Sequence, residues 1–235
     1  METIRNPKEE YLNPFEKNKI ETKIFDGSFH YNNLEIKIAN NTDELAEALA
    51  LTYEIYVNQN EYISKNKLTK AQLNRKMYWD KFDFSPNTIQ LIGIENGEIV
   101  ARARLNDKTT PLMENFSLKE YSEKPIREVS KLVHKLDHRK SLKTMLSIFN
   151  VIYNISKPFG QLFCTSFQHG SNMYEKMGSK IIGDFDNPNF PQDSKSLVHR
   201  WNLETLHLDF LNNPKASKRF IREMVMPIGG LKYAN

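Results

Sequence analysis

Few of the side chains that commonly do chemistry fall into a recognisable pattern in this sequence. His134, Asp137 and His138 lie close enough together to imitate a metal-binding cluster. They straddle the end of an expected strand with no further strong ligand nearby, so we predict no metal site. Cys164, the single cysteine, lies in an apolar strand without an identifiable base, which is typical of a packing residue. The G-x-G-x-x-G, P-loop, G-x-S-x-G and H-E-x-x-H signatures are all absent.

The composition indicates a globular protein with a sizeable core. The chain has 235 residues, of which 39% are hydrophobic and 11% aromatic, enough for one large domain or two small ones. Its 33 Lys+Arg and 29 Asp+Glu give a net charge of +4, too balanced to suggest a nucleic-acid-binding protein. One cysteine excludes a disulfide framework. No apolar run approaches the ~20 residues of a membrane helix and no signal peptide is evident, so we expect a cytoplasmic protein.

The chain divides into three parts by its patterning. Residues 1–32 are polar, without a sustained period, and predict an arm laid loosely over the surface. Residues 33–204 carry the periodic segments and form the expected domain. Residues 205–235 predict a helical tail in two pieces around Pro214.

The periodic segments predict a mixed α/β (α+β) domain. Expected strands cover residues 34–38, 88–95, 99–105, 127–134, 161–167, 180–183 and 197–203, with Asn96-Gly97 as a hairpin turn. Expected helices begin near Asn41, at the Thr69/Gln72 capping box, at Ser141 and at Ser171; Pro158 and Gly178 end the last two. Because a hairpin precedes the crossover helices, the order is not that of a doubly wound fold.

Residues 171–178, Ser-Asn-Met-Tyr-Glu-Lys-Met-Gly, lie before an expected strand. This segment resembles the L-Y-E-K-L-G-F helix, turn and strand of the GNAT superfamily of N-acyltransferases. Two positions depart from that pattern: Phe167 stands where an asparagine is common, and Ser179 where the phenylalanine is. The resemblance implies a largely antiparallel central sheet flanked by helices, with two central strands splayed to admit an acyl thioester.

Three further blocks give a narrower resemblance. They are Asp80-Lys-Phe-Asp83, then Arg104-Leu105 with Pro111-Leu-Met113 and Phe116, and finally Glu128-Val-Ser130-Lys131-Leu-Val133. In this order they resemble the D-x-x-D, R-L…P-x-M…F and E-x-S-R-F-x-V blocks of acyl-homoserine-lactone synthases and the related N-acyl amino acid synthases. Lys131 replaces the family arginine, and Thr52 stands where the first helix usually carries one.

This resemblance implies roles for the site residues. Glu128 would hold the incoming ammonium and take its proton, its charge offset by Arg104 so that it stays ionised. Tyr174 would protonate the departing thiolate, and a bulge in the Glu128 strand would aim a backbone N–H at the oxyanion. Ser130, Lys131, Asp80, Asp83 and Phe116 would contact the substrate.

The expected donor is a fatty acyl group carried as a thioester on phosphopantetheine. Residues 137–142, where the superfamily usually has a glycine-rich coenzyme A turn, contain no glycine. Arg139, Lys140 and Lys143 can still attract the phosphate and acidic helix of an acyl carrier protein. We therefore expect acyl carrier protein as donor, with acyl-coenzyme A as a possible substitute, and no tightly bound cofactor.

The sequence thus predicts an N-acyltransferase that moves a fatty acyl group from acyl carrier protein to the amine of an amino acid. Peripheral membrane contact is expected only through the product. Two alternatives remain open: an acyl-homoserine-lactone synthase using S-adenosylmethionine, and a catalytically silent acyl-binding module. The changes at Lys131 and Thr52 weaken the lactone-synthase reading because lysine lacks the bidentate fork of arginine.

Overall fold

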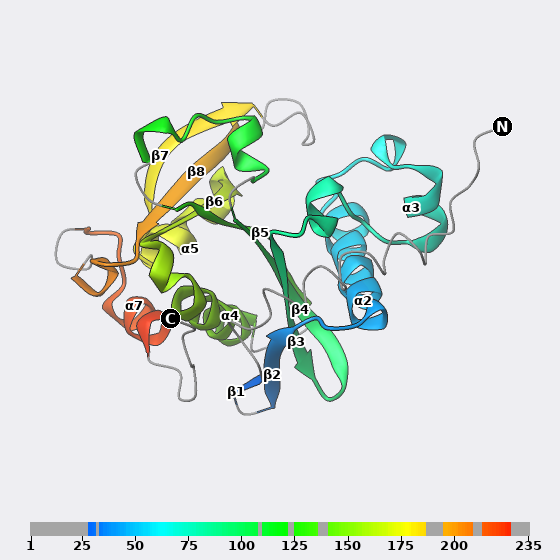
Figure 1. Cartoon of the computed structure of the whole chain (residues 1–235), viewed down its shortest axis with the longest axis horizontal. Coiled ribbons are helices and arrows are strands. Elements are labelled where there is room, and N and C mark those ends of the chain that lie inside the picture. Colours follow the sequence, from blue (N-terminus) through cyan, green and yellow to red (C-terminus); the bar gives the residue numbers. More distant parts are fainter. Residues whose placement is uncertain are drawn as a thin grey trace.

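The computed structural model describes residues 28–31, 33–107, 110–121, 125–135, 141–186, 195–208 and 213–226. Its centre is an eight-stranded sheet in the order β1-β2-β3-β4-β5-β6-β8-β7 (Figure 1). The strands are β1 (Ser28–Tyr31), β2 (Leu34–Ile38), β3 (Thr88–Glu95), β4 (Glu98–Asp107), β5 (Arg127–His134), β6 (Gln161–Phe167), β7 (Lys180–Asp186) and β8 (Lys195–Asn202). Among the described strands, only β5 and β6 pair in parallel, so the sheet is mixed and largely antiparallel, as predicted.

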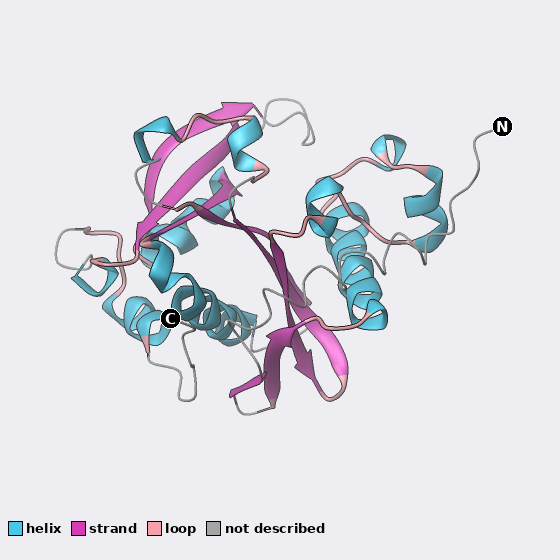
Figure 2. Ribbon diagram, viewed as in Figure 1, coloured by secondary structure: helices cyan, strands magenta, loops and turns pink. Residues whose placement is uncertain are grey.

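Helices cover both faces of the sheet. The α-helices are α2 (Thr42–Tyr53), α3 (Lys70–Arg75), α4 (Ser141–Ser156), α5 (Gln168–Lys176) and α7 (Lys218–Val225). Figure 2 shows α4, α5 and α7 gathered on one side of the sheet and α2 and α3 on the other. Among the residues that the structure describes, no helix combines the length and the apolar character that a bilayer crossing requires.

The face of the sheet toward α4 is apolar. Leu91, Ala103, Leu105 and Val129 are buried there against Phe149 and its neighbours on α4. This face follows from the alternation along β3 and β4, which puts Ile89 with Leu91, and Ala101 with Ala103 and Leu105, on one side. Burial of this continuous core supplies most of the driving force for folding.

The opposite face, toward α2, is polar in its centre although it is equally buried. Gln90, Arg102, Arg104, Asn106 and Glu128 all have exposed fractions of 5% or less. Such groups are costly to bury unless each finds hydrogen-bond or charge partners. This face therefore has to carry a connected polar network, and it is where the candidate site lies.

Strands β5 and β6 separate after a short paired stretch. Their parallel pairing runs from Arg127↔Leu162 only to Val129↔Cys164. Beyond it, β5 carries a bulge opposite Ala103, with Lys131 at a φ of 51°. The predicted splay is confirmed, and so is the bulge at the centre of β5.

Several local predictions are confirmed by the backbone. Asn41 caps α2 by accepting from the Glu44 N–H at 2.9 Å, and Thr69 and Gln72 form the expected capping box of α3. The hairpin of β3 and β4 turns at Asn96-Gly97. The first helix runs on as a π-helix over Glu54–Gln59, which sequence spacing did not reveal.

The prediction of an arm is wrong for residues 28–31. They form the edge strand β1, paired with β2 in the register Phe29↔Ile36. Phe29 is 9% exposed, and the Tyr31 hydroxyl donates to Asn150 of α4. The strand forms because Phe29 packs into the main hydrophobic core, and the other residues of that core are distant in sequence. Residues 1–27, and 227–235 of the expected tail, lie outside the described residues.

Gly178, the turn residue after α5, gives a stability prediction. Its φ is +89°, and an added Cβ would lie 2.5 Å from Leu206 Cδ1. Gly97 also has a positive φ, +79°, but open space around it. We expect Gly97→Ala to lower the free energy of unfolding by about 1 kcal/mol from strain alone, and Gly178→Ala by about 2–3 kcal/mol. Denaturant unfolding measures both, and equal losses would show that Leu206 relaxes freely.

Candidate active site

A cavity of about 880 Å³ occupies the opening between β5 and β6. Its walls come from both faces of the sheet: Arg104, Leu112 and Glu128 on the α2 side, Phe149 and Tyr174 on the α4 side. The volume is within the range of small-molecule sites, roughly 300–1,000 Å³. Because the cavity passes through the sheet, groups on opposite faces can act on one bound molecule.

Glu128 is the carboxylate that this cavity buries. It is 1% exposed, and its Oε2 accepts from the Leu112 N–H at 2.8 Å. Burial raises the pKa of Glu128 from its ordinary value of 4.5 to about 7, because the hydrogen bond to Leu112 and the charge of Arg104 offset only part of the desolvation. The carboxylate is thus poised between acid and base near neutral pH.

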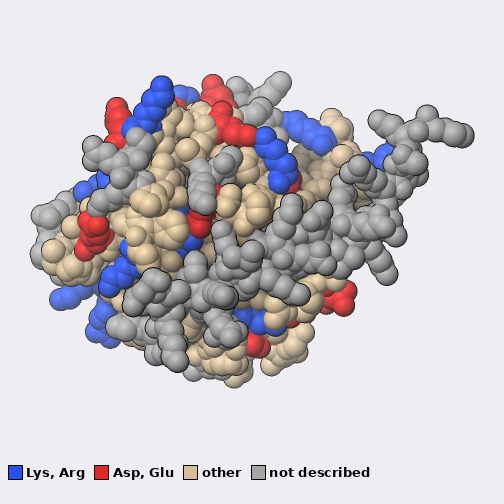
Figure 3. All heavy atoms as spheres, in the orientation of Figure 1, with Lys and Arg blue, Asp and Glu red and all other residues tan. Residues whose placement is uncertain are grey.

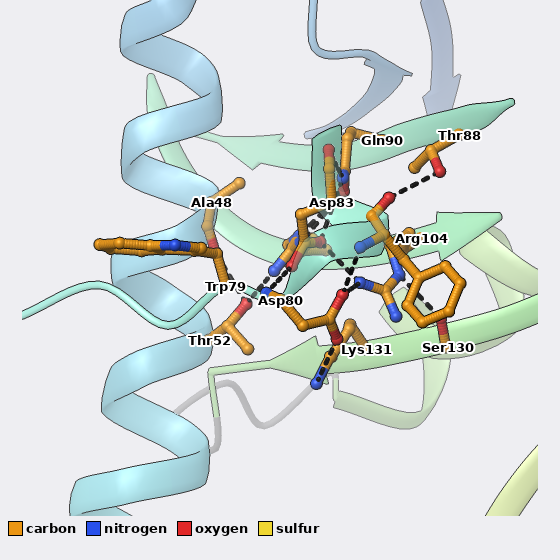
Figure 4. A network of polar contacts seen from close by, with 12 residues as sticks. Ala48, Thr52, Trp79, Asp80, Asp83, Thr88, Gln90, Arg104, Ser130 and Lys131 are labelled. Carbon is orange, nitrogen blue, oxygen red and sulfur yellow. Dashed lines mark hydrogen bonds and ion pairs between the residues drawn. The ribbon is translucent and has the colours of Figure 1, made fainter. Parts of the chain in front are cut away.

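The expected pairing of Arg104 with Glu128 is not what the structure shows. Arg104 Nη1 lies 2.5 Å from Asp80 Oδ1 and 3.0 Å from Asp83 Oδ1, and its Nε donates to Ser130 Oγ at 3.0 Å (Figure 4). Its charge is therefore engaged by two carboxylates from the segment that precedes β3. Burial outweighs the charge of Arg104 and raises the pKa of Glu128 to about 7, which goes against the expectation that Glu128 stays ionised.

Behind Arg104, a second arginine completes the buried network. Arg102 Nη1 donates to Thr52 Oγ1 at 2.6 Å, its Nε donates to Gln90 Oε1 at 3.1 Å, and its Nη2 pairs with Asp83. Burial alone would raise the pKa of Asp83, but Arg104 and Arg102 hold it well below its usual range. In the sequence, Thr52 is notable only because it stands where the first helix usually carries an arginine. In the structure, Thr52 accepts a hydrogen bond from Arg102 of β4.

Arg102, Gln90 and Thr52 were not predicted as site residues. Arg102 and Arg104 alternate on one face of a strand, which the sequence did show. Two cations on one buried face require two anions nearby, and Asp80 and Asp83 are spaced to supply them. That charge balance is the signal that could have identified the network.

Lys131 projects from the bulge into the cavity. Its Nζ lies 3.3 Å from Asp80 Oδ2, 4.3 Å from the centre of the Tyr78 ring and 5.4 Å from that of Tyr56. The side chain is 12% exposed. A carboxylate and two aromatic faces thus hold this ammonium in place at the cavity wall.

Tyr174 reaches the cavity from α5, on the other face of the sheet. Its ring packs against Phe149, His199 and Trp201, with centroids 5.2–5.8 Å apart. Burial raises the pKa of Tyr174 well above its ordinary value of 10. The phenol therefore stays protonated at neutral pH and can act as an acid but not as a base.

The remaining predicted site residues lie elsewhere. Asp83 is fully buried behind Asp80, and Phe116 packs on β7, where its Cε2 would be 2.6 Å from a Cβ on Gly183. Lys143 is exposed in the first turn of α4. Arg139 and Lys140 lie outside the described residues, as do Asp137 and His138 of the imitated metal cluster. In the described part of the chain, no three His, Cys, Asp or Glu side chains gather as metal ligands.

The sheet order, the splayed strands and the cavity between them define an N-acyltransferase of GNAT-like fold. Residues 47–192 match the family model of the N-acyl amino acid synthase FeeM. This match spans more than half of the chain, so the chain belongs to the FeeM family. The predicted family, fold class and acyltransferase activity are confirmed, and the silent-module alternative is set aside.

Solved structures share the fold at low sequence identity. FeeM, an N-acyl amino acid synthase from uncultured soil microbes, superposes with a TM-score of 0.61 at 10% identity, over 75% of this chain and 93% of FeeM. The AHL synthase LasI gives 0.55 at 16% identity, over 75% and 91%. TofI, solved in a ternary complex with an inhibitor and MTA, gives 0.55 at 15% identity, over 80% and 99%. A search of curated protein sequences finds no significant match.

The raised pKa of Glu128 predicts a pH-dependent stability. Between pH 4.5 and about 7 the folded chain keeps a proton that the unfolded chain has released, so stability falls as the pH rises through this window. Glu128→Gln has no such proton to lose. Relative to the wild type, its free energy of unfolding should rise between pH 5 and pH 8, by up to about 3 kcal/mol. Melting temperatures at both pH values test this, and a constant difference would contradict a buried, near-neutral carboxyl.

Proposed function

We propose that this enzyme moves a fatty acyl group from the thioester of acyl carrier protein to the amine of an amino acid. The observation that carries the proposal is the cavity through the splayed sheet, which brings Glu128 from one face and Tyr174 from the other to a single opening. Acyl transfer from a thioester to an amine needs a base for the amine and an acid for the sulfur. These two residues are the matching pair.

The donor thioester would lie along β5 in the opening. The bulge at Lys131 interrupts the ladder there and frees backbone groups to face the cavity, so an N–H of this segment can stabilise the oxyanion. Glu128, as the carboxylate, takes a proton from the acceptor ammonium, and the amine nitrogen attacks the carbonyl carbon. When the C–S bond breaks, the electron pair stays on sulfur and Tyr174 donates its proton to it. The nitrogen gives up its second proton to the Tyr174 oxygen, directly or through water, which leaves a neutral amide and restores the phenol.

Lys131 supports an amino acid as the acceptor. Its ammonium lines the cavity on the same side of the opening as Glu128 and is fixed by Asp80 and two tyrosine rings. It can bind the acceptor carboxylate as a point charge, without the bidentate geometry of arginine. The amine of that acceptor would then lie toward Glu128.

Acyl carrier protein is proposed as the donor because of the basic residues ahead of α4. Lys143 is exposed at the start of that helix, and Arg139 and Lys140 directly precede it in the sequence. A carrier-bound donor would also place the enzyme in the cytoplasm. The one cysteine, Cys164, is buried and free, which suits that reducing compartment.

The structural likeness to LasI and TofI supports a second candidate, an acyl-homoserine-lactone synthase. The two candidates share the donor and differ in the product. The enzyme is incubated with acyl carrier protein thioester and free amino acids in one mixture, and with the same thioester and S-adenosylmethionine in another. Mass spectrometry of the products distinguishes the two candidates. We expect N-acyl amino acids. Lactone as the sole product would show instead that the enzyme is an acyl-homoserine-lactone synthase.

Replacing Glu128 tests the base. With Glu128→Gln, we expect turnover to fall about 100-fold or more while acyl-donor binding survives, the usual scale for loss of a general base. Wild-type turnover should rise with pH through about 7, because only the ionised carboxylate can accept a proton. Glu98→Gln, an exposed change on the β3–β4 hairpin, is the control and should leave turnover unchanged. Near-normal turnover in a folded Glu128→Gln variant would rule this mechanism out.

Reversing charge ahead of α4 tests the carrier. Arg139→Glu with Lys140→Glu should raise KM for acyl carrier protein about tenfold, since opposed charges aid encounter, and high salt should mask the effect. The matched control reverses Arg219 and Arg222, which are exposed on α7, against the C-terminal half of α4. Equal efficiency of the wild type with acyl-coenzyme A and with the carrier-bound donor would contradict the proposal.

A further inference from the structure

A chain of three hydrogen-bonding side chains runs from the cavity into the protein through β6 and β8. Ser166 Oγ on β6 lies 2.8 Å from His199 Nε2 on β8, and His199 Nδ1 lies 2.9 Å from Ser179 Oγ in the turn after α5. Ser166 lines the cavity, whereas His199 and Ser179 are at most 1% exposed. The acyl transfer described above uses none of the three.

The network assigns a direction to these hydrogen bonds. Ser166 Oγ also donates to the carbonyl oxygen of Phe167 at 3.0 Å, so its own hydrogen is not directed at the histidine. A neutral imidazole has one donor and one acceptor nitrogen. His199 therefore donates from Nε2 to Ser166 and accepts at Nδ1 from Ser179, an assignment that rests on the network. Burial lowers the pKa of His199 to about 4, which keeps the ring neutral.

This arrangement fixes Ser166 as a donor. The Nε2–H of His199 occupies an acceptor site of the Ser166 oxygen, and the hydroxyl hydrogen has only an adjacent backbone carbonyl as its acceptor. A hydroxyl can rotate its hydrogen to a better acceptor at little cost. An anion formed in the cavity beside Ser166 would be such an acceptor.

Ser166 also lies on the appropriate face of the sheet. His199 pairs with Cys164 in the register of β6 and β8, so alternation puts Cys164, Ser166 and His199 on one face. Tyr174 packs on that same face, against His199 and Trp201. Glu128 is on the opposite face, because its neighbour Val129 packs with Cys164 toward α4. Ser166 therefore stands on the side of the leaving group.

We propose that Ser166 donates a hydrogen bond to the sulfur of the departing thiolate, and that His199 is the residue that positions it. The inference rests on the proposed acyl transfer and adds a catalytic residue to it. As the C–N bond forms and the C–S bond breaks, the electron pair collects on sulfur. Tyr174 transfers its proton to that sulfur, while Ser166 keeps its own proton and stabilises the developing charge. Ser179 holds the imidazole in the tautomer that this requires.

The test compares two donors that differ in leaving group. One is an acyl thioester of N-acetylcysteamine, an alkyl thiol like phosphopantetheine, and the other the same acyl group on thiophenol, a much more acidic thiol. Single-turnover rates of N-acyl amino acid formation are measured. Ser166→Ala should slow the alkyl donor on the order of 10- to 100-fold, less than loss of an oxyanion-hole donor because sulfur is a weaker acceptor. It should slow the thiophenyl donor by no more than about twofold, since that thiolate needs little stabilisation.

Two further variants separate catalysis from structure. Ser166→Thr keeps the hydroxyl and should restore most of the rate with the alkyl donor. His199→Gln should show the same dependence on the leaving group as Ser166→Ala, because it frees the serine hydroxyl to turn away. A purely structural link between β6 and β8 predicts instead a lowered melting temperature and equal rate losses with both donors.

The outcomes keep the two claims apart. If the wild type forms no N-acyl amino acid from the acyl carrier protein thioester, the proposed function is wrong and this role falls with it. If the wild type is active but Ser166→Ala slows both donors equally, or neither, only the role of Ser166 is overturned.

Discussion

The structure depends on one buried cluster of charge, in which Arg102 and Arg104 of β4 share the carboxylate of Asp83. Buried charges are tolerated only when they are paired and hydrogen-bonded, and here Thr52, Gln90 and other polar groups complete the set. The cluster anchors the segment around Asp83, and with it one cavity wall, to the sheet. It also pairs Arg104 with Asp80 and Asp83, so the charge of Arg104 offsets only part of the desolvation that raises the pKa of Glu128.

A second constraint is the one parallel pair among the described strands. Strands β5 and β6 join two antiparallel halves, and they hold together only as far as Val129↔Cys164. The opening is lined from both faces: Glu128 and Lys131 lie on the α2 side, and Tyr174 and Ser166 lie on the α4 side. On the face shown in Figure 3, the described Lys and Arg side chains are interspersed with Asp and Glu, so no large patch of one sign dominates there.

Local signals in the sequence predicted much of this fold. The turn at Asn96-Gly97 and the caps at Asn41 and Thr69 were readable because each depends on a few neighbouring residues. Partners distant in sequence were not: the pairing of Arg104 with Asp80 and the packing of Phe116 on β7 depend on how segments cross in space. Strand β1 was not predicted for the same reason. Its four residues form a strand because they pair with β2 at the edge of the sheet, which is a contact between segments.

The bulge in β5 has a further consequence for how the two cores are joined. Val129 and Val133 are four residues apart and would share a face in a regular strand, yet Val129 packs with α4 and Val133 with α2. The extra residue shifts the phase of the alternation, so one strand belongs to the α4 layer before the cavity and to the α2 layer after it. The left-handed backbone of Lys131 is thus the point where both hydrophobic layers are held in register with each other, beside the cavity.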